Sequence, residues 1–189
     1  YLFEMLLHGI KSGLIRWFPV DSAHILFLIY PAVGIILATL FVKYIVRDNI
    51  SEGVTRVLYA MSRRNSRIAG HNCWTSVVGG ATTIGFGGSV GPEAPIVLTG
   101  AAIGSNIGRL ARLNYKHTTL LLCCGAGAAL AAIFKAPITG VVFVLEILML
   151  DITAGSVIPL LIASITATTM AFMLRGFDPI LAITLAPED

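Results

Sequence analysis

The chain has 189 residues, of which 56% are hydrophobic and only 12% carry a charge. Soluble globular domains contain about 25% charged residues, so this composition excludes an ordinary soluble domain and indicates a membrane protein. The formal net charge of +3 is small, and residues 1–18 lack the basic region and cleavage site of a signal peptide. Because the sequence does not begin with Met, we expect it to be part of a longer protein.

Apolar stretches along the chain predict a series of membrane helices. Residues 25–42 and 154–174 are uncharged, and a bilayer crossing takes about 20 such residues. The stretches between them are shorter or are interrupted by glycine, proline or a charged residue: 68–90, 94–107, 118–134 and 138–150. Interrupted spans are typical of discontinuous helices that meet around a binding site inside the membrane. We therefore predict an all-α membrane protein with discontinuous and tilted transmembrane helices, organised as a single module over residues 1–189.

Basic residues concentrate in two connections between these stretches. The first precedes residue 68 and the second follows residue 107: Lys43, Arg47, Arg56, Arg63, Arg64 and Arg67, then Arg109, Arg112 and Lys116. If the two stretches between them form an up-and-down pair, both connections lie on one face, which the positive-inside rule makes cytoplasmic. We therefore expect a multi-pass protein of the cell (inner) membrane with cytoplasmic basic loops. The basic residues lie beside the bilayer without interleaved aromatic residues, so lipid contact explains them and nucleic acid binding is not expected.

The spacing of the cysteines and histidines does not match that of a disulfide framework, a metal site or an active site. The cysteines are odd in number, and Cys123 and Cys124 are adjacent in an apolar run, so they predict neither a disulfide framework nor a zinc site. The histidines show no HExxH or clustered spacing. We therefore expect no enzymatic activity, no metal and no cofactor.

Small residues recur at a spacing that favours close helix packing. Gly100, Gly104 and Gly108 repeat every four residues, and the stretch GAGAALAA at 125–132 is almost entirely small. Small residues allow helix backbones to approach closely in lipid. A nucleotide-binding loop is excluded, because no GK[ST] sequence follows the glycines.

One carboxylate stands alone in the middle of the apolar region. Glu93 lies between two prolines in the sequence GGSVGPEAPIV, and no other Asp, Glu, Lys or Arg occurs between Arg67 and Arg109. An ionised carboxylate deep in a bilayer costs several kcal/mol, so such residues usually serve function. The structural alternative is an acid in the first turn of a helix, where prolines are tolerated. The two interpretations are compatible, because a helix start also binds anions, and a carboxylate could occupy that site and leave it when protonated.

Two stretches resemble the CLC family of chloride channels and proton-coupled chloride exchangers. GGSVGPEAPIVLTGAAIG resembles the glycine–glutamate–proline signature of that family, and GAGAALAAIFKAPITGVVFVLEI resembles its small-residue helix, [NK]-A-P turn and apolar helix ending in glutamate. The two stretches occur in the order and spacing of the family. The resemblance implies an all-helical membrane fold built from two inverted repeats, of which this chain covers the first, about half of the transmembrane domain.

The resemblance assigns a role to Glu93. Glu93 takes the position of the gating glutamate, which competes with chloride at a helix start and swings away when protonated. Gly91, Pro92, Ala94 and Pro95 form the expected anion-binding segment around it. Pro92 stands where the family usually has Lys or Arg, which removes a cation and an N–H donor. Ala94 stands in place of Gly, which stiffens the turn.

A second anion-binding segment is expected in the sequence NISEGVTRVLYAM at 49–61. Gly53 and Val54 match the family pattern best. Glu52 falls where many members carry a serine that contacts chloride, and Ser51 lies one position earlier. Either Glu52 faces the cytoplasmic vestibule or the register is shifted by one. The alternative is an ordinary helix cap at Ser51 before a basic surface helix.

The resemblance implies voltage- or proton-gated chloride transport by a homodimer, with chloride and protons as the transported ions. Proton/chloride antiport and a passive channel both remain open. The position of the inner proton-accepting glutamate is occupied by Ile147, which cannot carry a proton and favours a channel. Residues 154–174, which present a Ser, Thr and Ala face, are expected to contribute to the dimer contact. A non-transporting membrane module or an inactive truncated fragment is the alternative from a different class.

Overall fold

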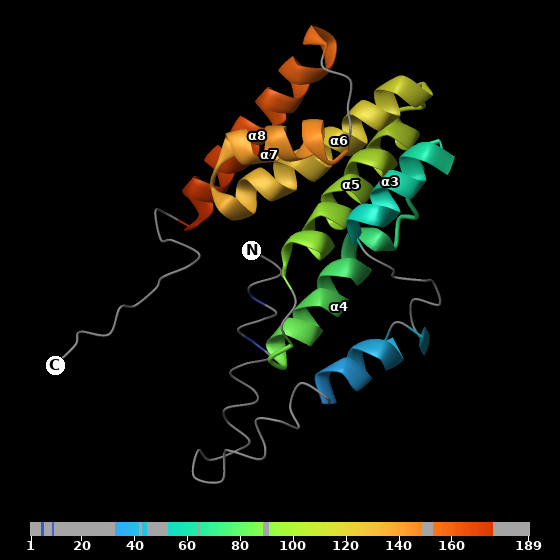
Figure 1. The fold of residues 1–189 in the computed structure, drawn as a ribbon, viewed down its shortest axis with the longest axis vertical. Coiled ribbons are helices and arrows are strands. Elements are labelled where there is room, and N and C mark those ends of the chain that lie inside the picture. The colour runs from blue at the N-terminus through green and yellow to red at the C-terminus, as the bar shows by residue number, and fades with distance from the viewer. Residues whose placement is uncertain are drawn as a thin grey trace, which may run out of the picture.

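The computed structural model describes residues 33–41, 43–44, 53–63, 65–88, 91–148 and 153–175, with Met5 and Gly9. Throughout these residues the regular secondary structure is helical (Figure 1), which confirms the all-α prediction for this part of the chain. The helices are α3 (Gly53–Arg63), α4 (Asn72–Gly85), α5 (Glu93–Leu110), α6 (Tyr115–Phe134), α7 (Pro137–Glu146) and α8 (Ala154–Arg175). Each apolar stretch expected from residue 68 onward overlaps one of the helices α4 to α8. Residues 33–41 form a helical segment inside the expected stretch 25–42, whose first residues lie outside the described part.

The turn between α6 and α7 follows from the sequence KAP. Lys135 adopts the left-handed conformation, with φ 52° and ψ 32°, and its N–H donates to the carbonyl of Ala131. Ala136 is extended, as the residue before a proline usually is. Pro137 then begins α7, where its missing N–H leaves no hydrogen bond unmade. The chain therefore reverses sharply between the two helices.

Glycines bring the backbones of α5 and α6 into contact. A Cβ at Gly100 would overlap the carbonyl oxygen of Gly125, and a Cβ at Gly104 would overlap that of Leu121. Gly108 lies against Thr118, where a Cβ would be 3.2 Å from its Cα. The prediction that this glycine repeat serves close helix packing is confirmed.

The other face of α6 packs against α7 and α8. A Cβ at Gly127 would lie 2.9 Å from Leu160 of α8, and a Cβ at Gly140 of α7 would overlap the carbonyl oxygen of Gly127. One turn and two turns beyond Leu160, Ser164 and Thr168 are also buried, and Thr168 Oγ1 donates to the carbonyl of Ala131 at 3.3 Å. Helix α6 is therefore the centre of the bundle, with α5 on one side and the pair α7 and α8 on the other.

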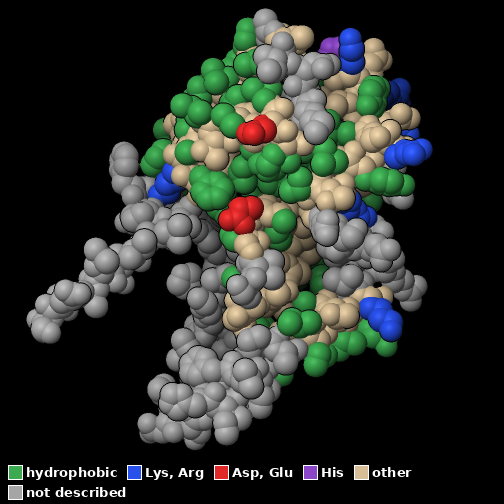
Figure 2. All heavy atoms as spheres, in the orientation of Figure 1, with side chains coloured by type: hydrophobic (Ala, Val, Ile, Leu, Met, Phe, Trp, Pro, Cys, Tyr) green, Lys and Arg blue, Asp and Glu red, His purple; other side chains and the backbone are tan. Residues whose placement is uncertain are grey.

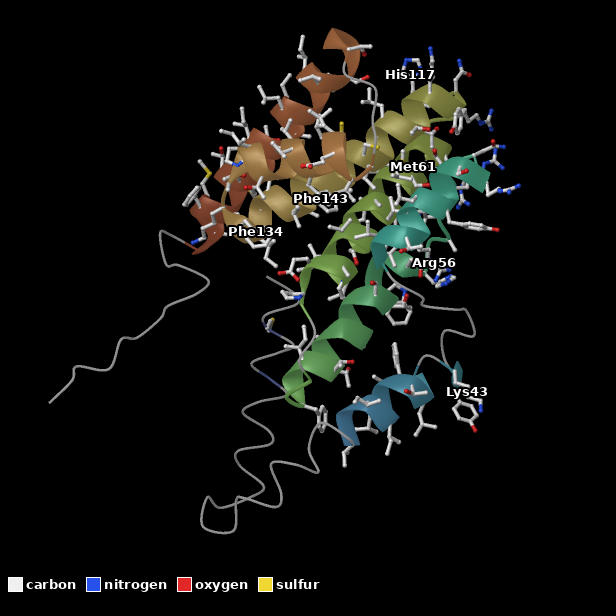
Figure 3. All side chains as sticks on the ribbon, viewed as in Figure 1. Lys43, Arg56, Met61, His117, Phe134 and Phe143 are labelled. Atoms are coloured by element: carbon white, nitrogen blue, oxygen red, sulfur yellow. The ribbon has the colours of Figure 1, made fainter. Side chains whose placement is uncertain are left out.

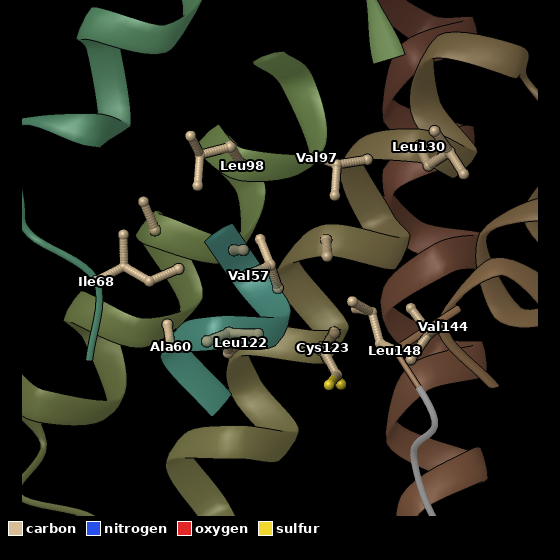
Figure 4. Close-up of a cluster of buried hydrophobic side chains, with 14 of the residues drawn as sticks. Val57, Ala60, Ile68, Val97, Leu98, Leu122, Cys123, Leu130, Val144 and Leu148 are labelled. Carbon is tan, nitrogen blue, oxygen red and sulfur yellow. The ribbon is translucent and has the colours of Figure 1, made fainter. Parts of the chain in front are cut away.

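The buried apolar side chains are mostly small and lie where these helices meet. Figure 4 shows the cluster, whose labelled members include Val57, Ala60, Val97, Leu98, Leu122, Cys123, Leu130, Val144 and Leu148. Large apolar side chains lie instead on the outside, and Ile162 of α8 is 57% exposed. Helices α6 and α8 contain the 20-residue segments Tyr115–Phe134 and Gly155–Leu174, each long and apolar enough to cross a membrane. Large apolar side chains on the outside are the reverse of the arrangement in a soluble protein. This arrangement fits a lipid solvent, in which an outward leucine or isoleucine side chain costs no free energy.

Candidate functional site

The first turn of α5 presents backbone donors around Glu93. The helix begins at Glu93, directly after Pro92. Neither Pro92 nor Pro95 has an N–H group, and the N–H of Ile96 donates to the carbonyl of Pro92 at 3.3 Å. The first N–H groups of a helix have no partner inside the helix, which leaves those of Glu93 and Ala94 as the donors of this turn. The helix dipole adds about half a positive charge at the same end.

The side chain of Glu93 folds back over this turn. Its Oε2 lies against the Cα of Gly91, so that a Cβ at Gly91 would overlap the carboxylate oxygen. Glu93 is exposed in the described part of the chain. The carboxylate therefore sits at the positive end of its own helix, as the first-turn interpretation predicted, and Gly91 provides the space for it.

The start of α3 lies directly against the start of α5. Gly53 is the first residue of α3, and a Cβ at Gly53 would overlap the carbonyl oxygen of Ala94 and lie 2.8 Å from its carbonyl carbon. Val54 is half-buried and packs on the apolar core. The structure thus brings together the two segments that the sequence singled out separately. Ser51 and Glu52 lie outside the described residues.

Helix α3 is more than a basic surface helix. Val57 and Ala60 are buried in the core that α3 shares with α5, and the two helices lie side by side in Figure 1. They run in the same direction, because their starts meet at Gly53 and the end of α3 contacts the start of α6, which follows α5 after a short connection. There Tyr115 Oη donates to the carbonyl of Met61 at 2.9 Å. Two helix dipoles therefore point their positive ends at one place.

The start of α5 lies alongside α4, which packs against α5. Figure 1 shows that α4 continues past the start of α5, so the chain returns to Glu93 after α4 ends. Helix α4 packs against residues 33–41 through Phe41 and Trp74, whose ring centroids are 6.5 Å apart, and a Cβ at Gly34 would overlap Phe86. A helix start placed alongside other helices is what the interrupted spans predicted.

The expected inner proton position lies at the end of α7. Helix α7 ends at Glu146, and Ile147 follows as its cap; both side chains are exposed in the described chain. Helix α7 packs against α6 and α8, whereas α3 packs against α5. Gly53 therefore contacts the helix turn that begins at Glu93, whereas Ile147 follows a helix that packs against α6 and α8. Lys135, in the turn before α7, lies with its Nζ 5.4 Å from the ring centroid of Phe172 of α8.

A buried polar cluster was missed by the sequence analysis. Ser105 Oγ of α5 donates to the carbonyl of Ser66 at 2.6 Å and accepts from the N–H of Ile68 at 3.0 Å. Ser66 and Thr119 share a hydroxyl–hydroxyl hydrogen bond of 2.6 Å. Asn106 Nδ2 donates to the carbonyl of Ile68 at 3.3 Å. These bonds tie the connection after α3 to α5 and α6. The sequence feature that could have predicted this cluster is the pair of adjacent polar residues, Ser105 and Asn106, in an otherwise apolar stretch.

Comparison with known proteins agrees with this architecture. The family model described as voltage gated chloride channel matches residues 34–188. A ClcB-like protein of Ralstonia nicotianae is 29% identical over 160 residues, which cover 82% of this chain and 37% of that protein. The H(+)/Cl(−) exchange transporter ClcA of Vibrio vulnificus is 30% identical over 156 residues, which cover 76% of this chain and 32% of the transporter. The chain thus spans about a third of the length of these curated relatives.

A solved structure has the same fold. The crystal structure of a slow cyanobacterial Cl−/H+ antiporter superimposes with a TM-score of 0.76 at 21% identity. The match covers 98% of this chain and 45% of the antiporter. The prediction of an all-α membrane fold is confirmed.

Proposed function

Because the chain belongs to the voltage-gated chloride channel family, we propose that it forms part of a pathway for chloride across a membrane and that Glu93 is its gate. The observation that supports this most directly is the contact between Gly53 at the start of α3 and Ala94 at the start of α5. The fold of this chain is that of an integral membrane protein, as in its relatives. We propose that it lies in the inner membrane and that its basic loops face the cytoplasm.

Two helix starts together can hold an anion without a charged partner. Each start contributes about 0.3–1 kcal/mol at an exposed site and up to about 2 kcal/mol when partly buried. Two starts would favour chloride by about 1–4 kcal/mol, which is up to a thousandfold in affinity. Pro92 supplies no cation at this turn, so the site depends on backbone dipoles and on the N–H groups of Glu93 and Ala94. Such a site binds chloride weakly enough to release it, as conduction requires.

Glu93 competes with chloride for the same donors. Its carboxylate already folds back to the positive end of α5 against Gly91. An ionised carboxylate and a chloride repel each other and need the same N–H groups, so only one of them occupies the turn at a time. Protonation removes the charge of the carboxylate, which then leaves the turn and opens the site. Chloride movement therefore depends on protons reaching Glu93.

Two forms of transport are compatible with this gate. In proton/chloride antiport, the proton taken up by Glu93 crosses to the other side. In a passive channel, Glu93 only opens and closes the site. Ile147 favours the channel, because its side chain cannot relay a proton from the end of α7. We further propose that the protein acts as a homodimer and that the outward apolar face of α8, which includes Ile158 and Ile162, contributes to the contact.

The test is to reconstitute the protein that contains this chain in chloride-loaded liposomes and to record chloride and pH together. Glu93→Gln carries no charge at any pH and is expected to give chloride efflux that no longer depends on pH. Glu146→Gln is the control, since it removes the other carboxylate among the described residues and should retain the pH dependence. Opposed proton movement in the wild type identifies an antiporter, and chloride efflux without it identifies a channel. If neither ion moves, the non-transporting module replaces this proposal.

A further inference from the structure

Positively charged side chains gather at the end of the bundle farthest from Glu93. They come from the end of α3, the connection after it, the end of α5, the connection after α5 and the start of α6: Arg63, Arg67, Arg109, Arg112 and Lys116. We refer to these five residues as the basic patch. All five are exposed, and Figures 2 and 3 show that most of the positive side chains of the described residues lie along one edge of the molecule.

Carboxylates of the described residues do not neutralise the basic patch. Those carboxylates are Glu93 and Glu146. Glu93 begins α5 and Arg109 lies near its end, so the two are about 24 Å apart along the helix at a rise of 1.5 Å per residue. Glu146 ends α7, which packs on α6 and α8, and both carboxylates lie apart from the positive edge in Figure 2. The patch is therefore a concentrated positive surface in a chain with few charges.

Hydrogen bonds hold the segments of the basic patch in place. Tyr115 Oη donates to the carbonyl of Met61 and ties the start of α6 to the end of α3. Ser66 bonds to Thr119 of α6 and accepts a bond from Ser105 of α5, which fixes the connection that carries Arg67. The cations are thus presented by a preorganised backbone, and a ligand need not order these segments when it binds.

Exposed leucines lie among the cations. Leu110 is 86% exposed and Leu113 is 41% exposed, and both lie in the sequence RLARLNYKH between Arg109 and Lys116. Arginine binds phosphate oxygens through two parallel N–H bonds, while an exposed leucine gains by entering an acyl-chain region. Alternation of the two residue types fits a ligand with a phosphate next to hydrocarbon, which is a phospholipid rather than a nucleic acid or a free anion.

We propose that the basic patch binds the phosphate of anionic phospholipids at the membrane surface, with Leu110 inserted beside their acyl chains. This inference does not depend on chloride transport. Each Lys or Arg near an anionic membrane surface contributes about 1 kcal/mol, so that removing two of them should weaken binding about 30-fold. Binding should also weaken as salt concentration rises, because the charges are exposed.

The test measures binding of the purified full-length protein to dioctanoyl phosphatidylglycerol, a water-soluble anionic lipid. The double variant Arg109→Gln and Arg112→Gln is expected to bind about 30-fold more weakly. Lys43→Gln is the matched control, since Lys43 is an exposed cation on a different segment, and should bind as the wild type does. Should the double variant fail to fold, Lys116→Gln serves instead, with an expected loss of about fivefold.

Two further probes separate a lipid from its parts. Glycerol phosphate carries the phosphate without acyl chains, and dioctanoyl phosphatidylcholine carries the chains without net negative charge. Both are expected to bind at least tenfold more weakly than phosphatidylglycerol, and Leu110→Ser should weaken only the lipid. Equal binding of glycerol phosphate would show a free-phosphate site, and equal binding of phosphatidylcholine would show a purely apolar contact. Either result, or unchanged binding by the patch variants, would overturn the proposal.

Discussion

Replacing Gly53 by alanine should separate the two helix starts on which the proposed chloride site depends. A Cβ at this position would overlap the carbonyl oxygen of Ala94 and lie 2.8 Å from its carbonyl carbon. Non-bonded carbon atoms prefer separations of about 3.5–4.0 Å, so α3 and α5 must move apart by about 1 Å at this point. The obstacle is backbone rather than a flexible side chain, so a rotamer change cannot relieve it.

The separation has two expected consequences. Overpacking of this kind lowers stability by about 1–3 kcal/mol, which should appear as a lower Tm. Moving the start of α3 away from the anion removes a contribution of about 1 kcal/mol, so chloride affinity should fall about fivefold. Both effects arise from the same displacement and should be seen in the same variant.

The assay is thermal unfolding together with chloride titration of the purified protein. Gly79→Ala is the matched control, because a Cβ at Gly79 in α4 has no neighbour within 4 Å. Alanine is favoured over glycine inside a helix by about 1 kcal/mol, so this control should keep or raise Tm and leave chloride affinity unchanged. If Gly53→Ala matched Gly79→Ala in both measurements, the close contact between the starts of α3 and α5 would be refuted.

Three other predictions concern the buried contacts and the inner proton position. Ser105→Ala leaves the N–H of Ile68 without its acceptor and should lower the free energy of unfolding by about 1–3 kcal/mol; an unchanged Tm would contradict the buried polar cluster. Gly125→Val places side-chain atoms against the carbonyl of Gly100 and should lower Tm by forcing α5 and α6 apart, while a wild-type Tm would argue against their contact. Ile147→Glu supplies a proton acceptor at the end of α7 and should raise the number of protons moved per chloride in liposomes; an unaltered ratio would show that this position does not limit coupling.

Helix starts and packing glycines could be predicted from the sequence because their causes are local. Pro92 and Pro95 are tolerated only near a helix start, and they placed the start of α5 at Glu93, where the structure has it. The four-residue spacing of Gly100 and Gly104 predicted a close helix contact. The partner of these glycines, Gly125, was present in the second small-residue stretch of the sequence.

Contacts between distant segments could not be predicted in this way. The approach of Gly53 to Ala94 depends on how α3 packs on α5, which the local pattern does not contain. The sequence around Ser66 is basic and polar and is typical of a surface loop, yet Ser66 is buried beneath α5 and α6. Its burial is possible because Ser105 and Thr119 satisfy its polar groups. The extent of α7 also differed, since the apolar run continues to residue 150 and the helix ends at Glu146.

The central claim is that chloride and the Glu93 carboxylate compete for the shared start of α3 and α5. Bromide, which scatters X-rays anomalously, replaces chloride in crystals of the protein and of Glu93→Gln. In Glu93→Gln, an anomalous peak is expected within hydrogen-bond distance of the N–H of Ala94, and in the wild type at neutral pH the carboxylate should occupy that place. A peak of equal height there in both proteins, or none in either, would contradict the competition and with it the role of Glu93 as a gate.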